Sequence, residues 1–213
     1  KIDDRATGRG SRTRRGAASA TLGSGRGAGR GVGTGVRAAT TVDGGGFFSG
    51  RTAGFGIGGL ENGIVNLINR MPRHRWRHAI VALTDSSAEY AQRIDRPDVR
   101  CIALGKKDGH LVRDYPRLYR LFRELGPAIV HTRNLAALEA VVPAWAAGVP
   151  VRIHGEHGWD MQDPAGKRRR YRHLRQLYRP FVSRYVALSR HLEDYLEEQV
   201  GIASDRISQI YNG

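Results

Sequence analysis

The chain has 213 residues, 40% of them hydrophobic, and a formal net charge of +15 at pH 7. This length allows one domain with a hydrophobic core, and the charge favours an anionic partner: nucleic acid, an anionic membrane surface or a phosphorylated small molecule. The single cysteine, Cys101, excludes an intrachain disulfide, and there is neither a secretory signal nor an apolar run of about 18 residues that would span a bilayer. We therefore expect a cytoplasmic protein, either soluble or peripheral on the inner face of the plasma membrane.

Residues 1–54 differ in composition from the rest of the chain. Of the 28 glycines, 18 lie in residues 1–59, which also hold ten Lys or Arg against three Asp or Glu. Because neither helical nor strand periodicity is present, this low-complexity segment is expected not to bury a core. Two interpretations stay open. The segment is either a disordered Arg/Gly tail that contacts RNA or acidic lipid through its charge, or the product of GC-rich DNA translated out of frame.

A glycine-rich stretch from Gly58 to Gly63 precedes an apolar-periodic run from Ile64 to Met71. The spacing of the apolar residues predicts a helix that packs one face on a core. A helix that begins at such a turn directs the positive end of its dipole toward it, which suits an anion. A loop followed by a core helix, without any ligand, explains the same pattern.

Short apolar runs of strand length then alternate with helical patterns. The expected strands are 78–83, 99–104, 128–131, 151–154, 184–189 and 207–211. The expected helices are 86–94, 114–125 with Asp114 as its cap, 135–147, 165–181 and 191–198. This alternation predicts an α/β fold, a Rossmann-like doubly wound parallel sheet with helices on both faces.

Ligands bind at the carboxyl ends of strands in such sheets, so three loops should gather along one edge. They are 58–63, 132–134 and 155–160. In the last loop, the His157 imidazole could hydrogen-bond a sugar hydroxyl or a phosphate, although a loop histidine is more often structural. We expect His131 and His154 to pack against a helix. Glu156, His157 and Asp160 lack a metal-ligand spacing, so no metal is expected.

Two enzyme classes are poorly supported. A Gly-x-Ser-x-Gly elbow is missing and Cys101 lies inside a strand, which argues against hydrolase-type nucleophilic catalysis. The glycines from Gly54 to Gly59 do not follow an aliphatic strand, which argues against a dinucleotide-binding dehydrogenase. The basic helix 165–181 could lie on an anionic membrane or hold a phosphorylated acceptor, and a solvated basic face explains it equally well.

Six stretches, taken in order, resemble the N-terminal half of family-four glycosyltransferases of the GT-B fold. The closest resemblance is to sugar transferases of bacterial exopolysaccharide systems. The stretches are 55–63, 129–134, 148–152, 154–160, 185–189 and 210–213. It is their order and spacing, more than any single motif, that carries the resemblance.

The resemblance implies a retaining, metal-independent hexosyltransferase that takes a nucleotide-diphosphate sugar as donor substrate and needs no cofactor. It implies a glycan or lipid-linked acceptor as partner, and no nucleic acid. His157 would contact the transferred sugar as the catalytic residue. The implied substrate-binding residues are Gly58, Gly59 and Glu61 in the glycine loop, and Arg133, Asn134 and Asp160 on the acceptor side.

Two departures from the family pattern lead to further expectations. No aliphatic strand precedes the glycine loop, because residues 50–54 stand in its place, so we expect the central strand to be missing. The sequence ends at Asn212 and Gly213, where the family continues into its donor-binding domain, so we expect that domain to be absent and the fragment to be inactive by itself. The alternative function is a non-enzymatic basic α/β protein whose Arg/Gly-rich tail binds RNA.

Overall fold

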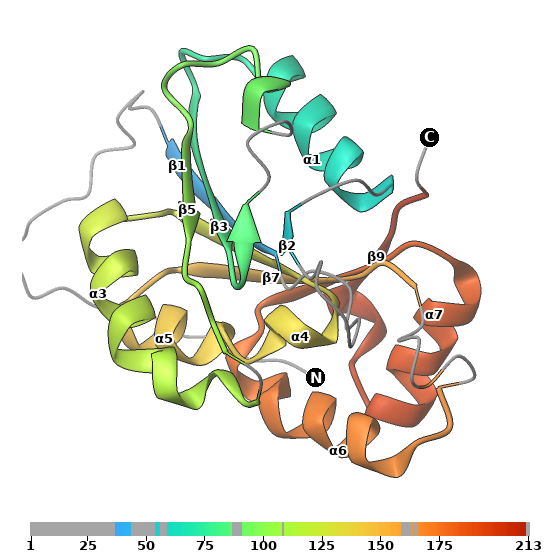
Figure 1. The fold of residues 1–213 in the computed structure, drawn as a ribbon. Helices are drawn as coiled ribbons and strands as arrows, with labels where there is room; N and C mark the ends of the chain where they lie inside the picture. Colours follow the sequence, from blue (N-terminus) through green and yellow to red (C-terminus); the bar gives the residue numbers. More distant parts are fainter. Residues whose placement is uncertain are drawn as a thin grey trace, which may run out of the picture. The chain divides into compact units, whose positions relative to one another are not determined.

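The protein is built on a seven-stranded parallel sheet with the strand order β5-β3-β1-β6-β7-β8-β9 (Figure 1). The computed structural model describes residues 37–43, 54–55, 59–86, 91–107, 109–158, 163 and 166–211. The strands are β1 Arg37–Asp43, β3 Trp76–Ala82, β5 Arg100–Ala103, β6 Ile129–Arg133, β7 Val151–Glu156, β8 Arg184–Ala187 and β9 Ile207–Gln209. A separate pair joins β2 Gly54–Phe55 to β4 Asp85–Ser86. The Rossmann-like α/β fold is thus confirmed.

The expectation that the central strand is missing is wrong, because β1 lies in the middle of the sheet (Figure 1). It pairs in parallel with β3 on one side and β6 on the other. Its β-branched residues favour an extended backbone, and Thr40 and Val42 are buried. Although residues 37–43 have little apolar character, hydrogen bonds to β3 and β6 hold them as a strand. The remainder of the predicted low-complexity segment, residues 1–36 and 44–53, lies outside the described residues.

Helices cover both faces of the sheet. On one face lies α1 Gly59–Arg70, whose Ile64 and Ile68 pack on Ile80 of β3. The other face carries the helices α3 Tyr115–Leu125, α4 Asn134–Leu138, α5 Val141–Ala146, α6 Arg169–Tyr178 and α7 Arg190–Asp194 (Figure 1). Shorter helical turns are η1 Leu111–Asp114, η2 Arg179–Phe181, η3 Tyr195–Val200 and η4 Ser204–Arg206.

Several helices differ from the sequence-based expectation. The helix expected over 135–147 is broken between α4 and α5. Pro143 explains the break, because its ring clashes with the carbonyl of the residue four positions earlier, Glu139, which lies in the gap. The side chain of Asp114 makes no capping hydrogen bond, since the turn η1 runs directly into α3.

The other departures concern segment length. The basic helix expected over 165–181 is regular only over α6, and Pro180 lies in the 3-10 turn that follows it. Part of the weak helix expected over 86–94 lies outside the described residues, while Ser86 belongs to β4. Within the described ranges, no helix has both the length and the apolar character to cross a bilayer.

Candidate functional site

The candidate site lies where β6 and β7 end side by side. In the register of this pair, Thr132 stands opposite His154 and Arg133 opposite Gly155. Successive residues of a strand point to opposite faces, so the two strands present two separate sets of side chains. Thr132, His154 and Glu156 belong to one face. The other face carries the residues that alternate with these along the two strands.

The first face holds a buried hydrogen-bonded network. The Nδ1 atom of His154 is 2.8 Å from Oγ1 of Thr132, and its Nε2 atom is 3.3 Å from Oε1 of Glu156. Arg175 of α6 donates to both carboxylate oxygens of Glu156, from Nε at 2.5 Å and from Nη2 at 3.0 Å. His154 is therefore buried and fixed by hydrogen bonds at both ring nitrogens.

Arg175 keeps Glu156 ionised. Burial alone would raise the pKa of Glu156, but the Arg175 charge and the hydrogen bonds from His154 and Arg175 outweigh it and hold the pKa below its usual range. A bidentate pair of this kind fixes geometry as well as charge. It ties α6 to the last residue of β7, immediately before His157.

The second face gathers two imidazoles around Gly155. The rings of His131 and His157 have centroids 6.3 Å apart. A Cβ atom at position 155 would clash with Nε2 of His157 and lie 3.0 Å from Nε2 of His131. Real Cβ atoms do not approach other atoms so closely, so any larger residue would push the His157 ring away. A residue without a side chain is needed here to let both rings approach the strand.

The ring nitrogens on this second face are buried but unpaired. Nε2 of His131 and both ring nitrogens of His157 have no hydrogen-bond partner among the described residues. Burial, and to a smaller extent the nearby Arg133 charge, lowers the pKa of both histidines to about 3. At neutral pH each ring is therefore uncharged and offers one N–H donor and one lone-pair acceptor.

Asn134 positions the loop that carries His157. Its backbone has a φ of 58°, in the left-handed region that asparagine tolerates better than most residues. Its side-chain Oδ1 accepts a hydrogen bond of 3.2 Å from the backbone N–H of His157. Three residues implied by the resemblance, Arg133, Asn134 and His157, thus lie together, although their roles stay predictions.

The other implied residues are placed less completely. Gly59 is the first residue of α1, and Glu61 lies in its first turn, but the Glu61 side chain is outside the description. Gly58 and Asp160 lie outside the described residues altogether. Across the described part of the chain, no group of three or more His, Cys, Asp or Glu side chains converges as metal ligands would.

Sequence reasoning did not include His131 among the site residues. We expected it to pack against a helix, and in the structure its ring lies near that of His157, beside Gly155. A signal was present, because His131 is two residues before Arg133 and must share its face of the strand. The partner of Glu156 carried no comparable signal, since Arg175 is 19 residues away on another element.

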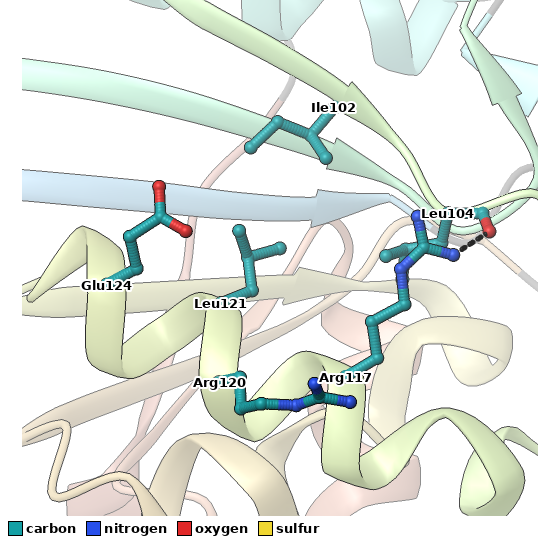
Figure 2. A pocket seen from close by; sticks show the side chains of 6 residues that line it. All are labelled: Ile102, Leu104, Arg117, Arg120, Leu121 and Glu124. Atoms are coloured by element: carbon teal, nitrogen blue, oxygen red, sulfur yellow. Dashed lines mark hydrogen bonds between the residues drawn. The ribbon is translucent and has the colours of Figure 1, made fainter.

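A groove of about 410 Å³ lies elsewhere, between the edge strand β5 and α3. It is lined by Ile102, Leu104, Arg117, Arg120, Leu121 and Glu124 (Figure 2). Nη1 of Arg117 donates to the backbone carbonyl of Leu104 at 2.5 Å, and Glu124 pairs with Arg100. Strands β3 and β1 separate this edge from β6 and β7, so the groove does not belong to the histidine site.

Comparison with known proteins identifies the fold and a family. The model of Glycosyltransferase Family 4 matches residues 57–213. A glycosyltransferase from Rickettsia africae superposes with a TM-score of 0.62 at 16% identity, covering 84% of this chain and 43% of that one. Anabaena Alr3699/HepE, solved in complex with UDP, gives 0.55 at 15% identity, covering 84% and 44%. UDP-N-acetylglucosamine 2-epimerase from Rickettsia bellii gives 0.55 at 14% identity, covering 82% and 44%.

These structures share the fold, and the chain spans less than half the length of each of them. No curated protein matches the sequence.

Proposed function

The chain belongs to glycosyltransferase family 4, and from this premise we propose that it is the acceptor-side half of a retaining, nucleotide-sugar-dependent hexosyltransferase. The proposed product is an exopolysaccharide or another cell-surface glycan. The observation that carries the proposal is His157, an uncharged imidazole with unpaired ring nitrogens at the carboxyl end of β7. Ligands of doubly wound sheets bind at this edge.

The proposed chemistry is electrostatic stabilisation of the transition state. The bond between the anomeric carbon of the sugar and the diphosphate breaks, and its electron pair leaves with the diphosphate while the sugar acquires oxocarbenium-like charge. The acceptor hydroxyl oxygen forms the new bond to that carbon, and its proton passes to the departing diphosphate. Preorganised dipoles and charges stabilise such a state without reorganising during the reaction. His157 would hold a hydroxyl of the transferred sugar, and Arg133 would supply positive charge near the departing group. Asn134, Asp160 and the glycine loop with Gly58, Gly59 and Glu61 would complete the substrate contacts.

The donor class rests on the family and on one solved relative. Anabaena Alr3699/HepE has been solved with UDP and with UDP and glucose. We propose a nucleotide-diphosphate sugar as donor for this chain, and a glycan or lipid-linked acceptor.

Saturation-transfer NMR tests the sugar contact. The purified chain is mixed with UDP-glucose, UDP-galactose, UDP-N-acetylglucosamine and GDP-mannose in turn. For at least one donor we expect saturation on the sugar protons, lost in His157→Ala and kept in His74→Ala, a control at an exposed turn histidine. Equal saturation in both variants, or none with any donor, would contradict the proposed function.

We further propose that α6 holds the protein on the inner, anionic face of the plasma membrane. Residues Arg169, Arg170, His173 and Leu177 recur at helical spacing on one exposed face of α6. Leu177 is 63% exposed and Trp145 is 54% exposed. The ring centroids of Trp145 and Phe181 are 5.2 Å apart. Basic side chains beside an exposed leucine and tryptophan suit the boundary between headgroups and acyl chains.

Vesicle sedimentation tests this surface. The chain should pellet with vesicles that contain phosphatidylglycerol but not with pure phosphatidylcholine, and added salt should release it. Removing one Arg of this face, as in Arg169→Gln, should weaken binding roughly fivefold. Arg123→Gln on α3 is the matched control, because that arginine is exposed on another helix. Equal binding to both vesicle types would refute the membrane contact.

A further inference from the structure

The edge strand β5 and the groove between it and α3 form a surface that the histidine site does not use. We propose that β5 pairs with an extended acidic segment of a partner protein, and that alternate side chains of this segment enter the groove. The proposal does not depend on sugar transfer, because β3 and β1 lie between β5 and the β6–β7 pair.

The outer side of β5 presents backbone groups to an added strand. Within the described part of the chain, β5 pairs only with β3 and is the first strand of the sheet (Figure 1). The backbone N–H of Leu104 donates to the carbonyl of Ala82, on β3, at 2.9 Å. Neighbouring residues of a strand direct their N–H groups to opposite sides, so those of Cys101 and Ala103 point away from β3. Such an edge is a template for a further strand.

The groove gives room to the side chains of that strand. Every second side chain of an added strand would point toward α3, on the side of the sheet where Ile102 lies. Figure 2 shows Leu121 and Glu124 directed from α3 toward the strand, with Ile102 on the opposite wall. The volume of about 410 Å³ lies within the usual range of ligand pockets. The groove can therefore hold both the apolar and the charged parts of a peptide.

The charge of the groove selects an acidic partner. Arg117 and Arg120 are exposed, and among the described residues their guanidinium groups bond only to backbone carbonyls. Glu124 is already paired with Arg100 at 3.0 Å. Three arginines thus stand against one carboxylate in and beside the groove. Carboxylates on the added strand would supply the missing negative charge.

Charge and composition argue against the other occupants. A second copy of the chain would bring the same arginines against each other. Residues 1–36 carry eight Lys or Arg against two Asp, so this segment would also be repelled. A nucleic acid would be attracted, but its bases bind by stacking on aromatic side chains, and none of the described residues that line the groove is aromatic. An acidic peptide strand matches both the backbone edge and the arginines.

Backbone amide NMR of the full chain tests this docking. The probe is a capped peptide of about eight residues in which valine and glutamate alternate, and the reference peptide has glutamine in place of glutamate. We expect the amide signals of Cys101 and Ala103 to shift with the acidic peptide, which should bind roughly fivefold more tightly than the reference. Absence of these shifts, or equal affinity of the two peptides, would refute the proposal. The same shifts with oligouridylate and not with the peptide, or on raising the concentration of the chain alone, would replace the peptide with RNA or with a second copy.

Two double variants separate the groove from the overall charge of the chain. Arg117→Gln/Arg120→Gln should weaken binding of the acidic peptide roughly fivefold and leave the glutamine peptide unaffected. Arg168→Gln/Arg190→Gln is the matched control, because it removes the same charge from exposed positions outside β5 and α3. Equal weakening by the two double variants would mean that the peptide responds to net charge and has no site in the groove.

Ala103→Pro tests the backbone contribution. It removes the N–H that points away from β3 and leaves the hydrogen bonds between β3 and β5 in place, so affinity for both peptides should fall roughly two- to tenfold. Ala103→Val keeps the N–H at the same exposed position and is the control. Equal affinity in the two variants would refute strand addition. If circular dichroism shows that Ala103→Pro does not fold, the amide shifts and the arginine variants decide the proposal.

Discussion

The two faces of the β6–β7 pair contain similar side chains in opposite states. On one face, His154 and Glu156 are buried and every ring nitrogen and carboxylate oxygen has a partner. On the other, His131 and His157 are also largely buried, and three of their ring nitrogens have no partner among the described residues. The two faces therefore differ in hydrogen bonding: the polar atoms of His154 and Glu156 are all paired, and three ring nitrogens of His131 and His157 are not.

The difference follows from what each face packs against. Helix α6 brings Arg175 to the first face, where it neutralises Glu156. The second face has Gly155 at its centre, and the His131 and His157 rings fill the position that its side chain would take. The variants below test this contrast, in order of decreasing expected effect.

Breaking the ion pair on the first face should have the largest effect. Arg175→Met leaves the Glu156 carboxylate buried without its cation, which should lower the free energy of unfolding by about 3–5 kcal/mol. Urea unfolding followed by circular dichroism measures this loss. The double variant Arg175→Met/Glu156→Leu should recover much of it, because no unpaired charge is left. A loss below about 1 kcal/mol in the single variant would show that the pair does not hold the fold.

Removing the hydroxyl at the far end of the network should cost less. Thr132→Val keeps the shape of the side chain but leaves Nδ1 of His154 without its partner at 2.8 Å. We expect a loss of about 1–3 kcal/mol, the usual cost of one unsatisfied buried polar group. Thr40→Val, at another buried threonine in β1, serves as the control. If the two variants lose the same stability, the His154 hydrogen bond contributes nothing of its own.

Acidification should lower the stability of the fold through His131 and His157 on the second face. His131 and His157 have a pKa of about 3 in the fold against an ordinary value of 6.5, so the unfolded chain binds more protons between these limits. The stability that they contribute at neutral pH is lost as pH falls below 6.5. We expect about 1 kcal/mol of loss per histidine between about pH 7.5 and about pH 5.5. Urea unfolding at both pH values should show a smaller loss in His131→Phe, and an unchanged loss would mean that His131 is not held neutral.

Substitution of Asn134 should cause the smallest loss of stability, because Asn134 contacts only the backbone of His157 and is not part of the hydrogen-bonded network of His154, Glu156 and Arg175. Asn134→Gly keeps the left-handed backbone accessible and removes only the acceptor of the His157 N–H, so stability should fall by about 0.5–1 kcal/mol. Asn134→Ala adds backbone strain and should cost more. Thermal unfolding of the two variants makes the comparison, and equal losses would rule out a contribution from the backbone conformation.

Much of the fold could be predicted from local patterns. Apolar runs of four to six residues alternating with amphipathic helices are enough to predict a parallel sheet, and they located β3, β5, β6, β7, β8 and β9 within a few residues. The same patterns missed β1, because its segment has few large apolar side chains. Pairing with β3 and β6 stabilises that strand, and neither partner is near it in the sequence.

The candidate site divides in the same way. A histidine before a glycine at a strand end, with Arg133 and Asn134 at the next strand end, could be recognised from the sequence and its family resemblance. The sequence by itself determined the α/β class, the family and the identity of these side chains, since each depends on local patterns and on their order along the chain. Only the tertiary structure decided that both ring nitrogens of His154 have hydrogen-bond partners while Nε2 of His131 has none among the described residues. Such partners depend on the strand register and on the approach of Arg175 from α6.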